Sequence, residues 1–136
     1  MTMQAVEHIS VYIDRPTAEV YRFASNPANL PRWAAGLAKA AVTQEGNEWV
    51  AEAPFGRVRI AFAPVNPFGV MDHDVTLESG IVVHNPMRVV AHGPGSEIIF
   101  TLFRQPGMTD ERFRADKAAI ENDLRTLKTL LENAGE

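Results

Sequence analysis

The chain has 136 residues and no cysteine, and its formal net charge is −4 at pH 7. A chain of this length normally forms one domain, so residues 1–136 are expected to fold as a single domain. The acidic balance argues against a nucleic-acid-binding protein, and the lack of cysteine excludes disulfides and thiol catalysis. No apolar run approaches the ~20 residues that cross a bilayer, and the start shows no signal-peptide pattern, which predicts a cytoplasmic protein.

The first part of the chain is predicted as a strand followed by two short helices. Apolar and polar residues alternate from Gln4 to Asp14, which is typical of a strand with one buried face. Pro16 to Ala24 is predicted as a helix, because proline suits the first helical position. A second short helix is expected to begin after Asn26, a good capping residue, and to carry Trp33.

Six further strands are predicted to follow as an antiparallel meander, because turns rich in glycine or proline separate short apolar segments. Their predicted spans are 38–44, 48–53, 57–63, 70–77, 81–92 and 98–103. Pro86 interrupts the fifth span. We interpret it as a bulge or an edge position, because proline cannot donate a hydrogen bond to a neighbouring strand.

The last quarter of the chain, Thr109 to Glu132, is predicted as one long helix. Thr109 is a suitable N-cap, and Asp110 places negative charge where the helix dipole favours it. A long amphipathic helix after a run of strands indicates an α+β fold in which the helix lies across a sheet. The apolar stripe of this helix consists of Phe113, Ile120, Leu124, Leu127 and Leu131.

Two early segments, 15–21 (RPTAEVY) and 26–33 (NPANLPRW), resemble the start of START-like, or SRPBCC, domains. This superfamily includes polyketide cyclase/dehydrase-like proteins, plant Bet v 1-type allergens and lipid-transfer domains. The element order β-α-α-β6-α extends the resemblance over essentially the whole chain. Residues 85–89 (NPMRV), with Asp116 and Asp123, resemble a bacterial branch. The resemblance implies a helix-grip fold, in which a curved antiparallel sheet of about seven strands wraps around the C-terminal helix.

The resemblance also implies a largely apolar cavity between sheet and helix that binds a small hydrophobic molecule, such as a polyketide, an aromatic metabolite or a lipid. No catalytic motif is shared across the superfamily, so it implies no catalytic residues, and enzymatic activity stays open. If the chain is an enzyme, cyclisation, dehydration or hydrolysis by a general base fits best. The alternative is a protein-interaction module, like the chaperone-activating or quinone-escort members, that acts through an apolar outer strand.

His73 is the first candidate for chemistry. In a strand, Asp72 and Asp74 point to one face and His73 to the other, more apolar face, which we take to be the concave one. A histidine there could act as a general base or hold a polar group of a ligand. The alternative is a hydrogen-bonded histidine without a chemical role.

Three other residues outside the long helix are candidates for ligand binding. Arg88 lies in an otherwise apolar strand, where it must pair with an acidic neighbour such as Glu97 or reach a carbonyl or anion in the cavity. Trp33 and Phe62 are candidate aromatic lining, because such sites are mostly apolar. Ordinary core packing is the alternative for both.

The first half of the long helix is predicted to form a pocket wall, because Phe113 is mixed there with Asp116 and Lys117. The alternative is that Lys117 extends to solvent and Asp116 pairs with Arg112 on the surface. The aliphatic second half, from Ile120 onward, is predicted to hold the sheet.

The sequence predicts no metal site and no cofactor. The four histidines are scattered, and Gly93-Pro94-Gly95 does not match a phosphate-binding loop. Residues 98–103 are apolar on both faces of their strand. This pattern motivates the hypothesis of a homodimer that buries the outer face.

Overall fold

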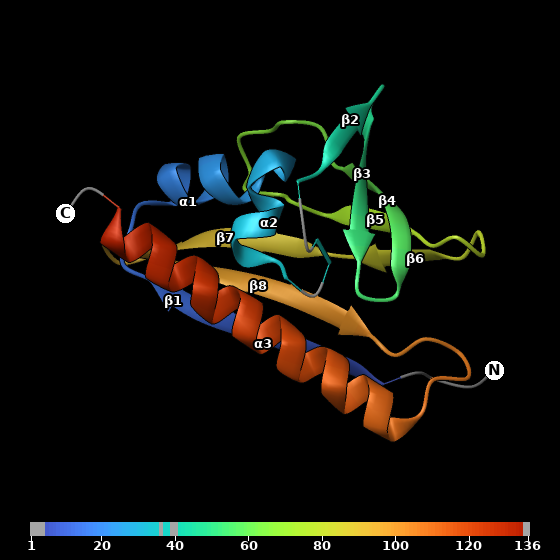
Figure 1. Ribbon diagram of the computed structural model, residues 1–136. Coiled ribbons are helices and arrows are strands. Elements are labelled where there is room, and N and C mark those ends of the chain that lie inside the picture. The colour runs from blue at the N-terminus through green and yellow to red at the C-terminus, as the bar shows by residue number, and fades with distance from the viewer. Residues whose placement is uncertain (1–4, 36, 39–40, 135–136) are drawn as a thin grey trace.

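The structure, a computed structural model, describes residues 5–35, 37–38 and 41–134 and has an α+β architecture (Figure 1). The helices are α1 (Thr17–Ala24), a 3-10 turn η1 (Pro27–Asn29), α2 (Leu30–Trp33) and α3 (Asp110–Asn133). The strands are β1 (Val6–Ile13), β2 (Thr43–Glu45), β3 (Glu48–Ala53), β4 (Gly56–Phe62), β5 (His73–Thr76), β6 (Val82–Asn85), β7 (Met87–His92) and β8 (Gly95–Phe103).

The described residues form eight strands in two antiparallel sheets, where about seven strands were expected. One sheet has the order β1-β8-β7 and the other the order β2-β3-β4-β5-β6. The extra strand arises because Pro86 divides the predicted strand 81–92 into β6 and β7. The two sheets stay connected, since Val70 bridges Arg88 and the Met71 amide donates to the Met87 carbonyl at 2.8 Å.

Two other predicted strands differ in length. Only β2 is strand within the predicted span 38–44, of which residues 39–40 lie outside the described residues. The predicted strand 70–77 is reduced to β5, because Val70 pairs with β7 instead. The register of β1 against β8 places Ile9, Val11 and Ile13 on one face, as the alternation predicts.

The predicted C-terminal helix is confirmed as α3. The Thr109 hydroxyl accepts a hydrogen bond from the Arg112 amide at 3.1 Å and so caps the helix. At the other predicted helix, Pro16 is the N-cap and α1 begins one residue later. None of the helices in the described part of the chain is long and apolar enough to cross a membrane.

The core lies where α3 packs along β1 and β8 (Figure 1). Leu124, Leu127 and Leu131 of α3 are buried there with Ile13 and Ile98 of the sheet. Burying such side chains stabilises the fold by roughly 1.5–3 kcal/mol each. The sheet β2–β6 lies further from α3, and this separation leaves room for the cavity described next.

Candidate functional site

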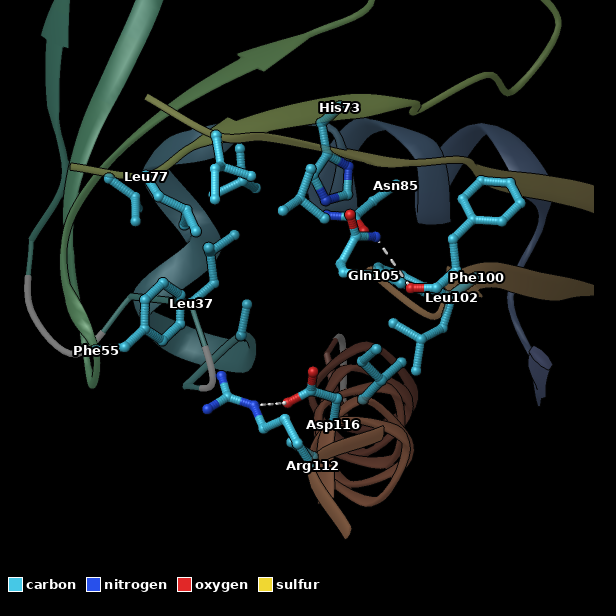
Figure 2. A pocket seen from close by; sticks show the side chains of 18 of the residues that line it. Leu37, Phe55, His73, Leu77, Asn85, Phe100, Leu102, Gln105, Arg112 and Asp116 are labelled. Atoms are coloured by element: carbon cyan, nitrogen blue, oxygen red, sulfur yellow. Dashed lines mark hydrogen bonds and ion pairs between the residues drawn. The ribbon is translucent and has the colours of Figure 1, made fainter. Parts of the chain in front are cut away.

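A cavity of about 640 Å³ lies between α3 and the sheet β2–β6, with α2 and the β8–α3 loop as further walls (Figure 2). Its volume is within the range of about 300–1,000 Å³ that is usual for small-molecule sites. Its walls are mostly apolar. They include Leu30, Trp33, Leu37, Phe55, Val58, Val75, Leu77, Phe100, Leu102, Ile120 and Leu124.

His73 lines this cavity from β5 and is 5% exposed. Its ring stacks on Phe62, with centroids 4.8 Å apart, and meets the edge of Phe100 at 5.9 Å. Its Nδ1 lies 3.0 Å from the Met71 carbonyl oxygen. As predicted, Asp72 and Asp74 point to the opposite face, where they bind Arg88 and His84.

The environment of His73 favours the neutral imidazole. Burial lowers its pKa below the ordinary value of 6.5, against smaller opposing effects of the Met71 hydrogen bond and of Asp72. Because a carbonyl oxygen can only accept, Nδ1 carries the proton, and the lone pair is on Nε2. Nε2 makes no hydrogen bond with the residues that the structure describes.

Two amide side chains lie beside His73 at the same end of the cavity (Figure 2). Asn85 of β6 is the direct cross-strand partner of His73, so both side chains are on one face of the sheet. Asn85 is 9% exposed. Gln105 reaches the cavity from the β8–α3 loop, and its Nε2 donates to the Phe103 carbonyl at 3.1 Å. We call these three residues the polar end.

The helix contributes a second group of polar residues. Arg112 and Asp116 both line the cavity, and their side chains are joined by an ion pair of 2.9 Å. The alternative interpretation of Asp116 as a partner of Arg112 is therefore correct, although the pair faces the cavity. Asp123 lies about two helical turns further along the same wall.

Two predicted pocket residues of α3 point elsewhere. Phe113 is 8% exposed and belongs to the core, and Lys117 forms a 3.5 Å ion pair with Glu7 of β1. The part of the cavity wall that α3 contributes consists of residues 112, 116, 119, 120, 123 and 124. This stripe shares Leu124 with the buried stripe of Phe113, Leu124, Leu127 and Leu131, but its centre is turned by roughly 60° from it.

Of the three remaining predicted site residues, only Trp33 lines the cavity. Its buried indole N–H has no partner among the described residues. Phe62 is not part of the cavity wall, and its ring stacks against the ring of His73. Arg88 is on the outer surface, where its Nε lies 2.9 Å from Asp72 Oδ1.

Arg88 pairs with an acidic neighbour, as one of its two interpretations expected, but that neighbour is Asp72. The expected partner, Glu97, instead contacts His92 at 3.0 Å. The hydrogen bond from Arg88 lowers the pKa of Asp72, which keeps that carboxylate ionised. Within residues 5–35, 37–38 and 41–134, no group of three histidine, aspartate or glutamate side chains is arranged to hold a metal ion.

Burial of His73 should make the fold less stable in mild acid. The pKa of His73 is lowered in the folded protein, whereas the unfolded chain takes up a proton near pH 6.5. Between the two pKa values the unfolded state binds more protons, so the free energy of unfolding falls as the pH drops below about 6.5. Urea titrations at about pH 7.5 and 5.5 measure this decrease in the free energy of unfolding. In His73→Phe the part of the decrease that comes from His73 should be absent. His84→Phe, on the outer face, should retain it, and an equal pH response of both variants would contradict the prediction.

Comparison with known proteins agrees with this architecture. Three solved structures share the fold at low identity. XoxI from Bacillus cereus has a TM-score of 0.76 at 12% identity, with 97% of this chain and 99% of that chain covered. The Aha1 dimer from Colwellia psychrerythraea has a TM-score of 0.72 at 14% identity, with 97% and 99% covered. Ara h 8.0201 has a TM-score of 0.69 at 13% identity, with 95% and 98% covered.

Sequence comparison gives the family. No protein of curated function matches the chain. The model of one protein family, described as polyketide cyclase / dehydrase and lipid transport, matches residues 4–132. That match spans nearly the whole sequence and agrees with the resemblance seen in residues 15–21 and 26–33. The chain belongs to the polyketide cyclase / dehydrase and lipid transport family, within the START-like superfamily of helix-grip domains.

Proposed function

We propose that this protein binds one small, mostly apolar molecule in the cavity between α3 and the sheet β2–β6. The observation that carries the proposal is an open space of about 640 Å³ with mostly apolar walls and a cluster of three uncharged polar side chains, the polar end, on one side. A domain in which helix and sheet only support each other would fill such a space with side chains, because protein interiors are close-packed. The family description, which includes lipid transport, supports the same function.

A protein-interaction module is the weaker alternative, because the outer face of β8 is less apolar than its sequence suggested. Phe100, Leu102 and Phe103 all contribute to the cavity wall. Thr101, on the outer face, bonds His8 of β1 at 3.0 Å. A homodimer through this face remains a prediction. A cytoplasmic location is likewise a prediction.

We rank binding above catalysis. The polar end contains one titratable group, His73, and the two amides beside it cannot transfer protons at neutral pH. If the protein is an enzyme, the free Nε2 of neutral His73 is the candidate general base. Arg88, on the outer surface, is too far around the sheet to orient a substrate in this cavity.

The proposed function predicts that filling the cavity blocks binding. Ala119 lines the cavity from α3 and has an exposed side chain, so Ala119→Trp adds an indole without removing core contacts. Pyrene, followed by its fluorescence anisotropy, should bind the wild-type protein and bind this variant at least about tenfold more weakly.

Ala118→Trp is the matched control for this experiment. Ala118 is the preceding residue of the same helix, is also exposed and is not part of the cavity wall. It should bind pyrene like the wild type. Equal binding by all three proteins would place pyrene outside this cavity and contradict the proposal, and so would a wild-type protein that does not bind pyrene.

A further inference from the structure

The polar end presents a defined pattern of donors and acceptors to a ligand. His73 offers only the lone pair of Nε2, because its Nδ1–H is held by the Met71 carbonyl. The orientation of Gln105 is also defined, because its Nε2 must donate to the Phe103 carbonyl. The carbonyl oxygen of Gln105 therefore points away from that bond, toward His73 in Figure 2. Both residues offer acceptors.

Asn85 completes the pattern with a donor. Its side-chain amide makes no hydrogen bond with any residue in the described part of the chain, and it lies beside His73 on the same face of the sheet. An amide in this position, nine-tenths buried, needs a partner inside the cavity, since an unsatisfied buried polar group costs about 1–3 kcal/mol. Its NH₂ group can donate to an oxygen that simultaneously donates to His73.

We propose that the polar end formed by His73, Asn85 and Gln105 recognises a neutral hydroxyl group and selects hydroxylated ligands over the corresponding ethers and carboxylates. This inference rests on the proposed function, because it specifies which molecules the same cavity prefers. A hydroxyl group donates to Nε2 of His73 or to the Gln105 carbonyl while its oxygen accepts from Asn85. One group then satisfies the donor of Asn85 and one of the two acceptors.

Ethers and carboxylates cannot complete this pattern. An ether oxygen accepts from Asn85 but leaves the acceptors of His73 and Gln105 without a donor. A carboxylate places its lone pairs against both acceptors, and it also loses its hydration shell. A site built to bond a hydroxyl group discriminates strongly against analogues that lack one, because its buried groups remain unpaired.

The charges around the cavity also disfavour an anionic ligand. The wall contains two arginines, and both are already paired: Arg112 with Asp116 at 2.9 Å and Arg57 with Glu52 at 2.9 Å. Three carboxylates lie in the same wall, those of Glu78, Asp116 and Asp123. Binding of a carboxylate would therefore place like charges in one partly desolvated space.

Three pyrene derivatives of similar size test this inference: hydroxypyrene, methoxypyrene and pyrene carboxylate. Their dissociation constants are measured by fluorescence anisotropy near pH 7.5, where His73 is neutral. The wild-type protein should bind hydroxypyrene about tenfold more tightly than methoxypyrene, the effect of one hydrogen-bonded group, and pyrene carboxylate most weakly.

Two variants should reduce the preference without removing binding. His73→Phe retains an aromatic ring and leaves only the Gln105 acceptor, so its preference for hydroxypyrene should fall at least about twofold while its affinity for methoxypyrene does not decrease. Gln105→Met changes a loop residue, so it provides a second test if His73→Phe does not fold, and it should reduce the preference at least about twofold. His84→Phe makes the same change as the first variant on the outer face of the adjacent strand, where His84 binds Asp74, and should behave like the wild type.

The outcomes separate the inference from the proposed function. If methoxypyrene or the carboxylate binds as tightly as hydroxypyrene, or if the preference is undiminished in both His73→Phe and Gln105→Met, hydroxyl recognition by the polar end is wrong while ligand binding stands. If none of the three compounds binds the wild-type protein, the proposed function is contradicted and the inference is overturned with it.

Discussion

Leu127→Ala is expected to lower the free energy of unfolding by about 2–5 kcal/mol, the usual range for truncation of a fully buried leucine. Leu127 is 0% exposed and lies in the core between α3 and the sheet β1-β8-β7. Removing its isopropyl group leaves a void on a rigid helix surface, where neighbouring side chains cannot close the gap. The substitution therefore loses the transfer free energy of the removed atoms and adds the cost of the cavity they leave.

Ile120→Ala is the matched comparison on the same helix. Ile120 is only partly buried, because one side of it lines the cavity, so truncation enlarges a space that already exists. We expect a loss of about half that of Leu127→Ala or less. Urea denaturation of both variants measures the two values. An Ile120→Ala loss equal to or greater than that of Leu127→Ala would show that this part of α3 is core rather than cavity wall.

The two halves of α3 show what the sequence predicts well. Apolar spacing and the Thr109 cap gave the position of the helix to within one residue at either end, because both signals are local. The prediction that its aliphatic half holds the sheet agrees with the burial of Leu124, Leu127 and Leu131. The pocket wall was harder to predict. A shift of one residue rotates a helix by about 100°, and it separates Phe113 and Lys117 from the cavity while Arg112 and Asp116 line it.

The polar end shows a signal that sequence analysis missed. The turn at residues 78–80 pairs Leu77 with Ile81 through a backbone hydrogen bond of 2.8 Å. Opposing partners in an antiparallel hairpin are equally far from the turn, so His73, four residues before Leu77, faces Asn85, four residues after Ile81. Asn85 could thus have been placed beside His73 from the turn alone. Gln105 could not, because a loop residue has no periodic pattern that predicts where it points.

The split of the sheet at Pro86 depends on both local and distant contacts. Proline predicted an interruption of the strand, because it has no N–H to donate. The predicted meander includes the pairing of β7 with β8 across the turn at residues 93–94. It did not predict that β7 would leave the sheet of β6 for the sheet in which β8 pairs with β1, the first strand of the chain. The junction that results is held by the segment around Gly69 and by Asp72, whose carboxylate accepts from the Met87 amide at 2.9 Å.

Gly69→Ala should destabilise the protein at this junction. Gly69 has a φ of +72°, and a methyl group added to it would overlap the backbone carbonyl oxygen of Val89 and lie 2.9 Å from Val89 Cγ1. The overlap cannot be relieved by rotating a side chain, because the Val89 amide is bonded at 3.0 Å to the Gly69 carbonyl. We expect a loss of at least about 3 kcal/mol, from the cost of the left-handed backbone together with the steric overlap.

Gly46→Ala separates these two contributions. Gly46 also has a positive φ, +64°, but an added methyl group would meet nothing within 4 Å. Its substitution should therefore cost only the backbone term, about 1 kcal/mol. Thermal and urea unfolding of both variants gives the comparison. Equal losses would mean that β7 can shift away from residue 69, and the junction would then not fix the position of β5, which carries His73, relative to β7.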